Sequence, residues 1–230
     1  MRKKGFWPLR ISGFILFVVF FYASLEPVMS QTPQRRLPTP TIDGTKSLEA
    51  AIEQRRSERG FSDKNLSLKQ LGQLLWAAQG ITGQMHGVPL RAAPSAGALY
   101  PIDVYVVDAE GVFRYLPADH DLKKVHAGDL RSVLAKAALG QPWVAQAPVD
   151  IVLCAVYSRL STKYGTRAVR YAQIEAGHIA QNIHLQAVAL GLGSVPVGAF
   201  VDEQVKAALS LPEDQEPLYI IPVGHVKSQE

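Results

Sequence analysis

The fold is decided by the segment from Thr166 to Phe200, which reads TRAVRYAQIEAGHIAQNIHLQAVALGLGSVPVGAF. Its apolar residues surround nearly the whole circumference of a helix, a pattern typical of a helix at the centre of a protein. On a helical wheel, Tyr171, Glu175, His178 and Asn182 form one polar stripe. Polar groups are costly to bury unless they pair or meet a ligand. The stripe therefore indicates either a polar network at an interface or one wall of a binding site.

The composition indicates one folded domain with appendages. The chain has 230 residues, of which 47% are apolar and 19% are charged, so a sizeable core is available. Its single cysteine, Cys154, excludes an internal disulfide and a thiolate metal cluster, and we expect it to be a buried apolar residue. His178 and His184 lie six residues apart and do not share a helix face, so no metal site is predicted.

The N-terminus has the pattern of a targeting segment. Basic residues precede an apolar run at 11–25, which has about the length of a signal h-region. Residues 1–30 are interpreted as a cleaved signal peptide or a membrane anchor, which predicts an exported protein in the periplasm or on the outer face of the cytoplasmic membrane. These residues hold four basic groups and one acid, +3 of the net +4, so the basic pI does not indicate nucleic-acid binding.

The remainder divides into a proline-rich linker at 31–44 and a domain at 45–227. The predicted fold class is α+β, with a central mixed or antiparallel sheet flanked by helices, because short turns join neighbouring strands. A capping box at Ser67 opens one helix, Asp202 is expected to cap another, and Gly80–Leu90 is expected to be a loop. We expect helices at 47–56, 67–78, 129–139, 142–147, 166–190 and 202–209, and strands at 102–108, 112–115, 149–157, 194–197 and 218–224.

Three short segments could bind a ligand. The first gathers guanidinium groups and a hydroxyl, which suit phosphate oxygens, although a solvated basic helix end has the same pattern. The second is a tract of small residues that lets the backbone approach a flat ring, or forms a tight turn. The third offers bare backbone N–H groups after a strand, and it does not match a dinucleotide fingerprint. Their residues are Arg55, Arg56, Ser57 and Arg59; Pro94, Ser95, Ala96, Gly97 and Ala98; and Val197, Gly198 and Ala199.

Five segments in this order resemble the nitroreductase family of flavoproteins, and they look most like its SagB-type dehydrogenase branch. They are RRSERGF, RAAPSAGALYP, KYGTRAVRYAQIEAGHIAQN, GLGSVPVGAF and EPLYIIPVGH, and they span roughly Lys46 to Val226. The resemblance implies a nitroreductase-like fold, FMN as cofactor and an intertwined homodimer. The long helix would lie in the core of that dimer, which favours an interface over substrate contact for its polar stripe.

The resemblance also implies roles for the three segments. Arg55, Arg56, Ser57 and Arg59 would hold the FMN phosphate and ribityl chain. Pro94–Ala98 would lie against the flavin, commonly from the partner subunit, and Val197, Gly198 and Ala199 would direct a backbone N–H toward flavin N5. Lys163 and Tyr164 stand where azoline dehydrogenases are expected to carry a catalytic base pair, although Lys163 could equally be a solvated loop residue.

The predicted function is that of an FMN-dependent oxidoreductase. It would transfer hydride by a ping-pong mechanism between a donor such as NAD(P)H and a small nitro, quinone or azoline-type acceptor, because the flavin supplies the hydride chemistry. The alternative is an exported flavin-binding or sensory module without turnover.

Overall fold

A seven-stranded antiparallel sheet forms the centre of the computed structural model, which describes Met1 and residues 34–227. The strand order is β1-β6-β5-β4-β7-β9-β8, so the apolar β7 is flanked on both sides, as its sequence predicts. The strands are β1 (Gln34–Arg36), β4 (Ile102–Asp108), β5 (Gly111–Leu116), β6 (Asp121–Ala127), β7 (Val149–Ala155), β8 (Gly193–Ser194) and β9 (Glu216–Gly224).

Alternating side chains of the central strands build two cores, one on each face of the sheet. Val104 and Leu153 belong to the larger core, and their neighbours Tyr105 and Cys154 belong to the smaller one. Cys154 is completely buried and unpaired, as expected. Because both faces are covered by helices, strands such as β7 are apolar along their whole length.

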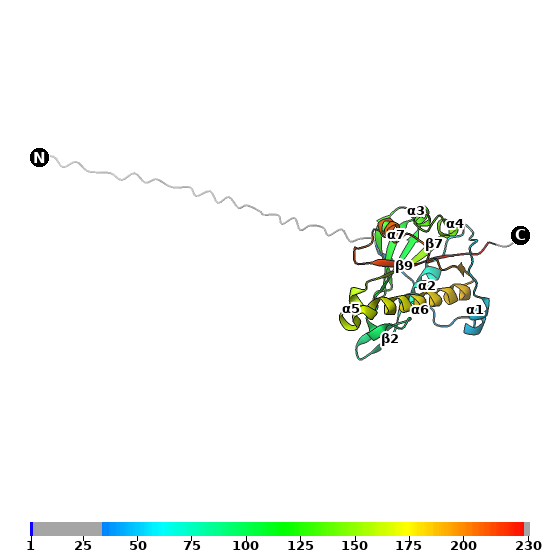
Figure 1. The fold of residues 1–230 in the computed structure, drawn as a ribbon, viewed down its shortest axis with the longest axis horizontal. Helices are drawn as coiled ribbons and strands as arrows, with labels where there is room; N and C mark the ends of the chain where they lie inside the picture. The colour runs from blue at the N-terminus through cyan, green and yellow to red at the C-terminus, as the bar shows by residue number, and fades with distance from the viewer. Residues whose placement is uncertain (2–33, 228–230) are drawn as a thin grey trace. The chain divides into compact units, whose positions relative to one another are not determined.

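The helices form one layer on each side of this sheet (Figure 1). The larger core is covered by α2 (Leu68–Gln79), α5 (Ser158–Tyr164) and α6 (Ala168–Ala189), and α1 (Leu48–Gln54) packs against α6. The smaller core is covered by α3 (Arg131–Ala137), α4 (Pro142–Gln146) and α7 (Asp202–Leu209). Short 3-10 turns at η1 (Ala96–Ala98) and η2 (Gly165–Arg167) complete the described helical elements. The fold is thus α+β with an antiparallel sheet, which confirms the predicted class.

The residues of the polar stripe on α6 differ in their exposure to solvent. Glu175 is buried, His178 is exposed, and the Asn182 amide donates to the carbonyl of Ala77 in α2 at 3.0 Å. The stripe is therefore partly internal to the chain, because α2 packs along α6 and covers some of its polar residues.

The capping residues predicted for the start of α2 and the end of α6 are confirmed, and the one predicted for the start of α7 is wrong. The capping box at Ser67 is present, and Gly191 ends α6 with a φ of 69°, a conformation that favours glycine. Asp202, the predicted cap of α7, is instead its first helical residue and follows Val201, which makes no side-chain cap. The acidic side chain still lies in the first turn, where the helix dipole favours it.

Several chain segments differ from the prediction, among them α5, which no pattern indicated. The expected loop at Gly80–Leu90 is a hairpin of β2 (Ile81–Met85) and β3 (Val88–Arg91), turning through His86 and Gly87 with positive φ. β6, which no pattern indicated, pairs with β5. Part of the predicted linker forms β1, because Arg35 makes an ion pair of 2.8 Å with Asp108 and fixes the segment to the sheet edge.

The described residues 34–227 belong to one compact unit. The predicted targeting segment, including the apolar run at 11–25, lies outside the described residues. Within residues 34–227, no helix has the length and apolar content needed to cross a membrane.

Candidate functional site

The arginine-rich segment after α1 is joined to β8. Ser57 and Ser194 form a parallel bridge, and the backbone N–H of Glu58 donates to the carbonyl of Ser194 at 3.0 Å. The approach leaves no room for a side chain at Gly193, where a Cβ would lie 2.7 Å from the Cβ of Glu58. The first and third predicted segments are therefore brought together, because β8 leads directly into Val197.

The three arginines of this segment have no carboxylate partner among the described residues. Arg55 is half-buried, Arg56 is exposed and donates to backbone carbonyls, and Arg59 lies 5.3 Å above the ring of Trp143. Glu58, which could have neutralised them, pairs with none of the three. The segment thus presents three guanidinium groups that form no ion pair within residues 34–227, which suits a bound phosphate.

His184 connects this segment to α6, a role that the sequence analysis missed. Its Nδ1 lies 2.7 Å from the Ser194 hydroxyl, and the ring is buried. Burial, together with the charge of Arg55, lowers the pKa of His184 to about 4, so the imidazole is neutral at neutral pH. The signal that could have found it is a single polar residue within the apolar stripe Ala180, Ile183 and Ala187.

The third segment presents backbone donors at the surface. Val197 is fixed by hydrogen bonds in both directions with Ile220, at 2.8 and 3.0 Å. Gly198 and Ala199 follow it and are exposed, and no acceptor within residues 34–227 takes their N–H groups. Gly198 packs against Tyr219, 3.4 Å from where a Cβ would stand, so a larger residue would press on that ring. These two N–H groups are available to a ligand.

The second segment lies against the predicted catalytic pair. η1 carries Gly97 with a φ of 63°, and a Cβ there would lie 2.8 Å from the Tyr164 hydroxyl and 3.0 Å from Lys163 Nζ. Tyr164 is held by an edge-to-face contact with Tyr171 of α6, with ring centroids 5.1 Å apart. The structure therefore brings Lys163 and Tyr164 to the small-residue segment, although sixty-odd residues separate them in sequence.

The buried carboxyl of Glu175 lies next to Ser95 of the small-residue segment Pro94–Ala98. Its Oε1 accepts from Gln79 Nε2 at 3.3 Å, and its Oε2 is buried with no partner among the described residues. Burial raises the pKa of Glu175 to about 7, and the neighbouring Ser95 and Gln79 side chains oppose that rise. Ser95 also accepts from the N–H of Tyr100 at 2.9 Å, which fixes the turn.

The predicted site residues thus form two groups. Arg55, Arg56, Ser57 and Arg59 lie with the strand that leads to Val197, Gly198 and Ala199, and Pro94–Ala98 lies with Lys163 and Tyr164. No hydrogen bond or ion pair joins the two groups in the described part of the chain. They reach α6 at His184 and at Glu175, about 13 Å apart along a helix that rises 1.5 Å per residue.

The arginine segment and the exposed N–H groups of Gly198 and Ala199 lie at one edge of the sheet, where they could hold a phosphate-bearing ligand. The sequence model of the Nitroreductase family matches residues 52–225. The chain therefore belongs to the nitroreductase family, and the predicted enzyme class is confirmed.

Two known nitroreductases resemble this chain over most of its length. Protein MJ1384 of Methanocaldococcus jannaschii, described as a nitroreductase, is 39% identical over 192 residues, 80% of this chain and 93% of its own length. A crystal structure described as a nitroreductase from Ralstonia eutropha JMP134 has a TM-score of 0.77 at 34% identity and covers 88% and 93% of the two chains.

More distant relatives carry specific activities in their names. FMN reductase [NAD(P)H] of Bacillus subtilis is 26% identical over 74% of this chain and 62% of its own length. The microcin B17-processing protein McbC of Escherichia coli is 29% identical over 66% of this chain and 59% of its own length. The SagB-type resemblance is thus present at low identity.

The comparisons contradict the predicted localisation. The family match and the archaeal relative place the chain among nitroreductases and carry no sign of an export signal. The prediction of an exported, periplasmic or membrane-anchored protein is therefore wrong. It rested on basic residues followed by the apolar run at 11–25, and this pattern at a chain end does not by itself establish targeting.

Proposed function

We propose that this chain is an FMN-dependent oxidoreductase that transfers hydride between NAD(P)H and a small organic acceptor by a ping-pong mechanism. The observation that carries the proposal is the arginine segment joined to β8, with three uncompensated guanidinium groups beside a strand that ends in free N–H groups at Gly198 and Ala199. A phosphate and a flavin N5 need these two kinds of donor. Bound FMN would supply the hydride chemistry, and the chain would hold and orient it.

The cofactor part of the proposal is tested on the purified full chain. We expect a flavin spectrum that NADH or NADPH bleaches without oxygen and that an added quinone restores. Replacing Arg55 with Gln removes a half-buried donor, so FMN should bind about ten- to a hundredfold more weakly, the range expected for one charge-assisted hydrogen bond. Lys136→Gln, which removes a charge from an exposed position on α3, is the control.

Two results would overturn this proposal. A chain that takes up no FMN has no flavin chemistry, and an Arg55→Gln variant that retains FMN as well as the control does not use the arginine segment as its phosphate clamp. A yellow protein that no donor reduces would instead support the flavin-binding module without turnover.

The contact of Lys163 and Tyr164 with Gly97 favours a second candidate substrate class. Oxidation of an azoline ring to an azole removes a hydride, which bound FMN would accept, and a proton, which we propose this pair accepts. Lys163→Ala should then slow the reductive half-reaction with an azoline substrate by about a hundredfold or more, while reduction by NADH, which releases no such proton, stays unchanged. Equal slowing with both donors would refute a role in proton transfer.

We further propose an intertwined homodimer, formed through the helical layer on the α6 side. Apolar side chains are exposed there on α1, α6 and the β2–β3 hairpin, including Ile52 at 56%, Ile174 at 50% and Met85 at 56%. A groove of about 700 Å³ between α1, α2 and the C-terminal half of α6 adjoins them. A partner seated on this layer would bring its own Pro94–Ala98 segment toward the arginine segment.

Light scattering during size-exclusion chromatography tests the dimer. The unaltered chain should elute at twice the chain mass, and Ile174→Asp should elute as a monomer because it places a charge in an apolar interface. Val133→Asp on α3 is the matched control, since Val133 is 45% exposed on the opposite layer. A monomeric unaltered chain, or an Ile174→Asp variant that stays dimeric, would contradict this assembly.

A further inference from the structure

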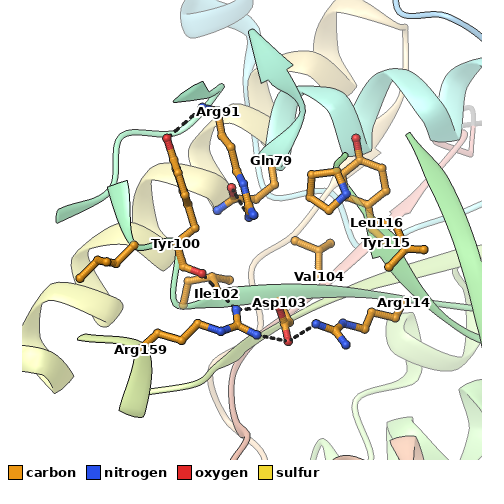
Figure 2. A pocket seen from close by; sticks show the side chains of 12 residues that line it. Gln79, Arg91, Tyr100, Ile102, Asp103, Val104, Arg114, Tyr115, Leu116 and Arg159 are labelled. Atoms are coloured by element: carbon orange, nitrogen blue, oxygen red, sulfur yellow. Dashed lines mark hydrogen bonds and ion pairs between the residues drawn. The ribbon is translucent and has the colours of Figure 1, made fainter. Parts of the chain in front are cut away.

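Two neighbouring strands separate at one end of the sheet. The register between β4 and β5 ends at the pair Tyr105↔Arg114, although both strands continue past it. β4 remains paired with β7 back to Ile102, and β5 remains paired with β6 out to Leu116. A crevice of about 230 Å³ lies in the resulting fork (Figure 2).

One wall of the crevice carries two arginines on a shared carboxylate. Arg159 contacts both oxygens of Asp103 at 2.9 and 3.0 Å, and Arg114 Nη2 lies 3.0 Å from Oδ2 (Figure 2). Gln215 adds a fourth contact to Asp103 at 2.8 Å. The carboxylate is therefore fully engaged, whereas Arg114 Nε is buried with no partner in the described chain.

Arg91, from β3, occupies the opposite wall. Within residues 34–227 its side chain donates to the neutral amide of Gln79, from Nη1 at 3.3 Å, and its guanidinium carbon lies 4.3 Å above the ring of Tyr100. Burial lowers the pKa of Arg91, although the charges of Glu175 and Asp103 oppose this, and neither carboxylate forms an ion pair with it. A half-buried guanidinium without a carboxylate partner is costly, and an anion would offset that cost.

The charge balance and the remaining walls define the ligand. The crevice holds three guanidinium groups and one carboxylate, an excess of two positive charges. Apolar side chains complete the lining, among them Leu99, Val104 and Pro117. Its volume is below the range of about 300–1,000 Å³ that drug-sized ligands need, so only a small molecule fits.

We propose that the crevice between β4 and β5 binds a small organic carboxylate, with Arg91 and Arg114 contacting the carboxylate and the apolar lining covering its body. The site is separate from the three segments assigned to the flavin, and the binding does not require the flavin. Leu99 and Tyr100 line it and directly follow Ala98, so a bound carboxylate lies next to the small-residue segment without occupying it.

Calorimetric titration of the full chain with benzoate tests this site. We expect saturable binding of one benzoate per chain, with benzamide, which has the same shape and no charge, binding at least tenfold more weakly. Inorganic phosphate should displace bound benzoate only poorly, because it gains nothing from the apolar lining. Absence of benzoate binding, equal binding of benzamide, or displacement of benzoate by phosphate at equal concentration would each overturn the proposal.

Variants of Arg91 show whether the ligand lies in the crevice. Arg91→Gln should weaken benzoate binding about tenfold or more, as expected for losing a charge-assisted hydrogen bond, whereas Lys136→Gln on α3 should leave it unchanged. If Arg91→Gln does not fold, Arg91→Lys keeps the charge without the planar fork and should bind benzoate several-fold more weakly. Unchanged affinity in the folded Arg91 variant, or an equal loss in Lys136→Gln, would refute this location.

Discussion

Glu175 should make the stability of this protein depend on pH in an unusual direction. Glu175 is 2% exposed, its Oε1 accepts from Gln79, and its Oε2 has no hydrogen-bond partner within residues 34–227. Burial raises its pKa from the usual 4.5 to about 7. Between these two pH values the folded protein holds a proton that the unfolded chain has released. Stability therefore falls as the pH rises through this range, and the loss is complete above about pH 7.

The size of the effect follows from the pKa. A rise of about 2.5 pH units corresponds to roughly 3 kcal/mol of destabilisation above pH 7, at 1.36 kcal/mol per unit. Glu175→Gln keeps the size of the side chain and a carbonyl that can accept from Gln79, but it cannot ionise. The variant should exceed the unaltered chain in free energy of unfolding by about 1 kcal/mol at pH 5 and by roughly 3 kcal/mol at pH 8.

Urea unfolding of both proteins at several pH values measures this difference. Other groups titrate in the same range, His184 among them, but they are common to both proteins and cancel when the two free energies are subtracted. A difference that stays constant from pH 5 to pH 8 would show that Glu175 is already ionised in the folded protein, and the reasoning from burial would fail.

Three further substitutions test other parts of the fold. Gly193→Ala should push the arginine segment away from β8, which should lower the free energy of unfolding by about 1–3 kcal/mol and weaken flavin binding. Gly60→Ala is the control, because a Cβ at Gly60 would have no atom within 4 Å. Urea unfolding and flavin titration should give the same values for Gly60→Ala as for the unaltered chain. Ser67→Ala should cost about 1 kcal/mol in urea unfolding because it removes the capping box of α2. Asp103→Asn should lower the free energy of unfolding by about 3 kcal/mol, the low end for a buried ion pair, because Arg114 and Arg159 are 39% and 33% exposed.

The sequence predicted those elements whose signals are local. β7 and α6 follow from continuous apolar patterns, and α2 from its capping box. β6 and the β2–β3 hairpin were not predicted, because their strands are largely exposed and lack an apolar period. β1 depends on the contact of Arg35 with Asp108, a residue 73 positions away, which no local pattern encodes.

In the candidate site, too, the sequence could not predict which residues distant along the chain come into contact. Residue types indicated the arginine segment and the small-residue segment, but not which of them meet in space. The bridge from Ser57 to Ser194 and the approach of Tyr164 to Gly97 are long-range contacts. Arg91 and Asp103 were missed altogether, since their importance arises from the separation of β4 and β5, which only the register reveals.

α6 positions both groups of site residues through one buried polar side chain each. Glu175 reaches Gln79 and the small-residue segment, and His184 reaches Ser194 beside the arginine segment. Nine residues separate the two, so at about 100° per residue they point to opposite sides of the helix. A single helix can therefore hold two different segments apart at a fixed distance. In the proposed homodimer, the same rigidity would set the distance between the phosphate-binding segment of one chain and the Pro94–Ala98 segment of the other.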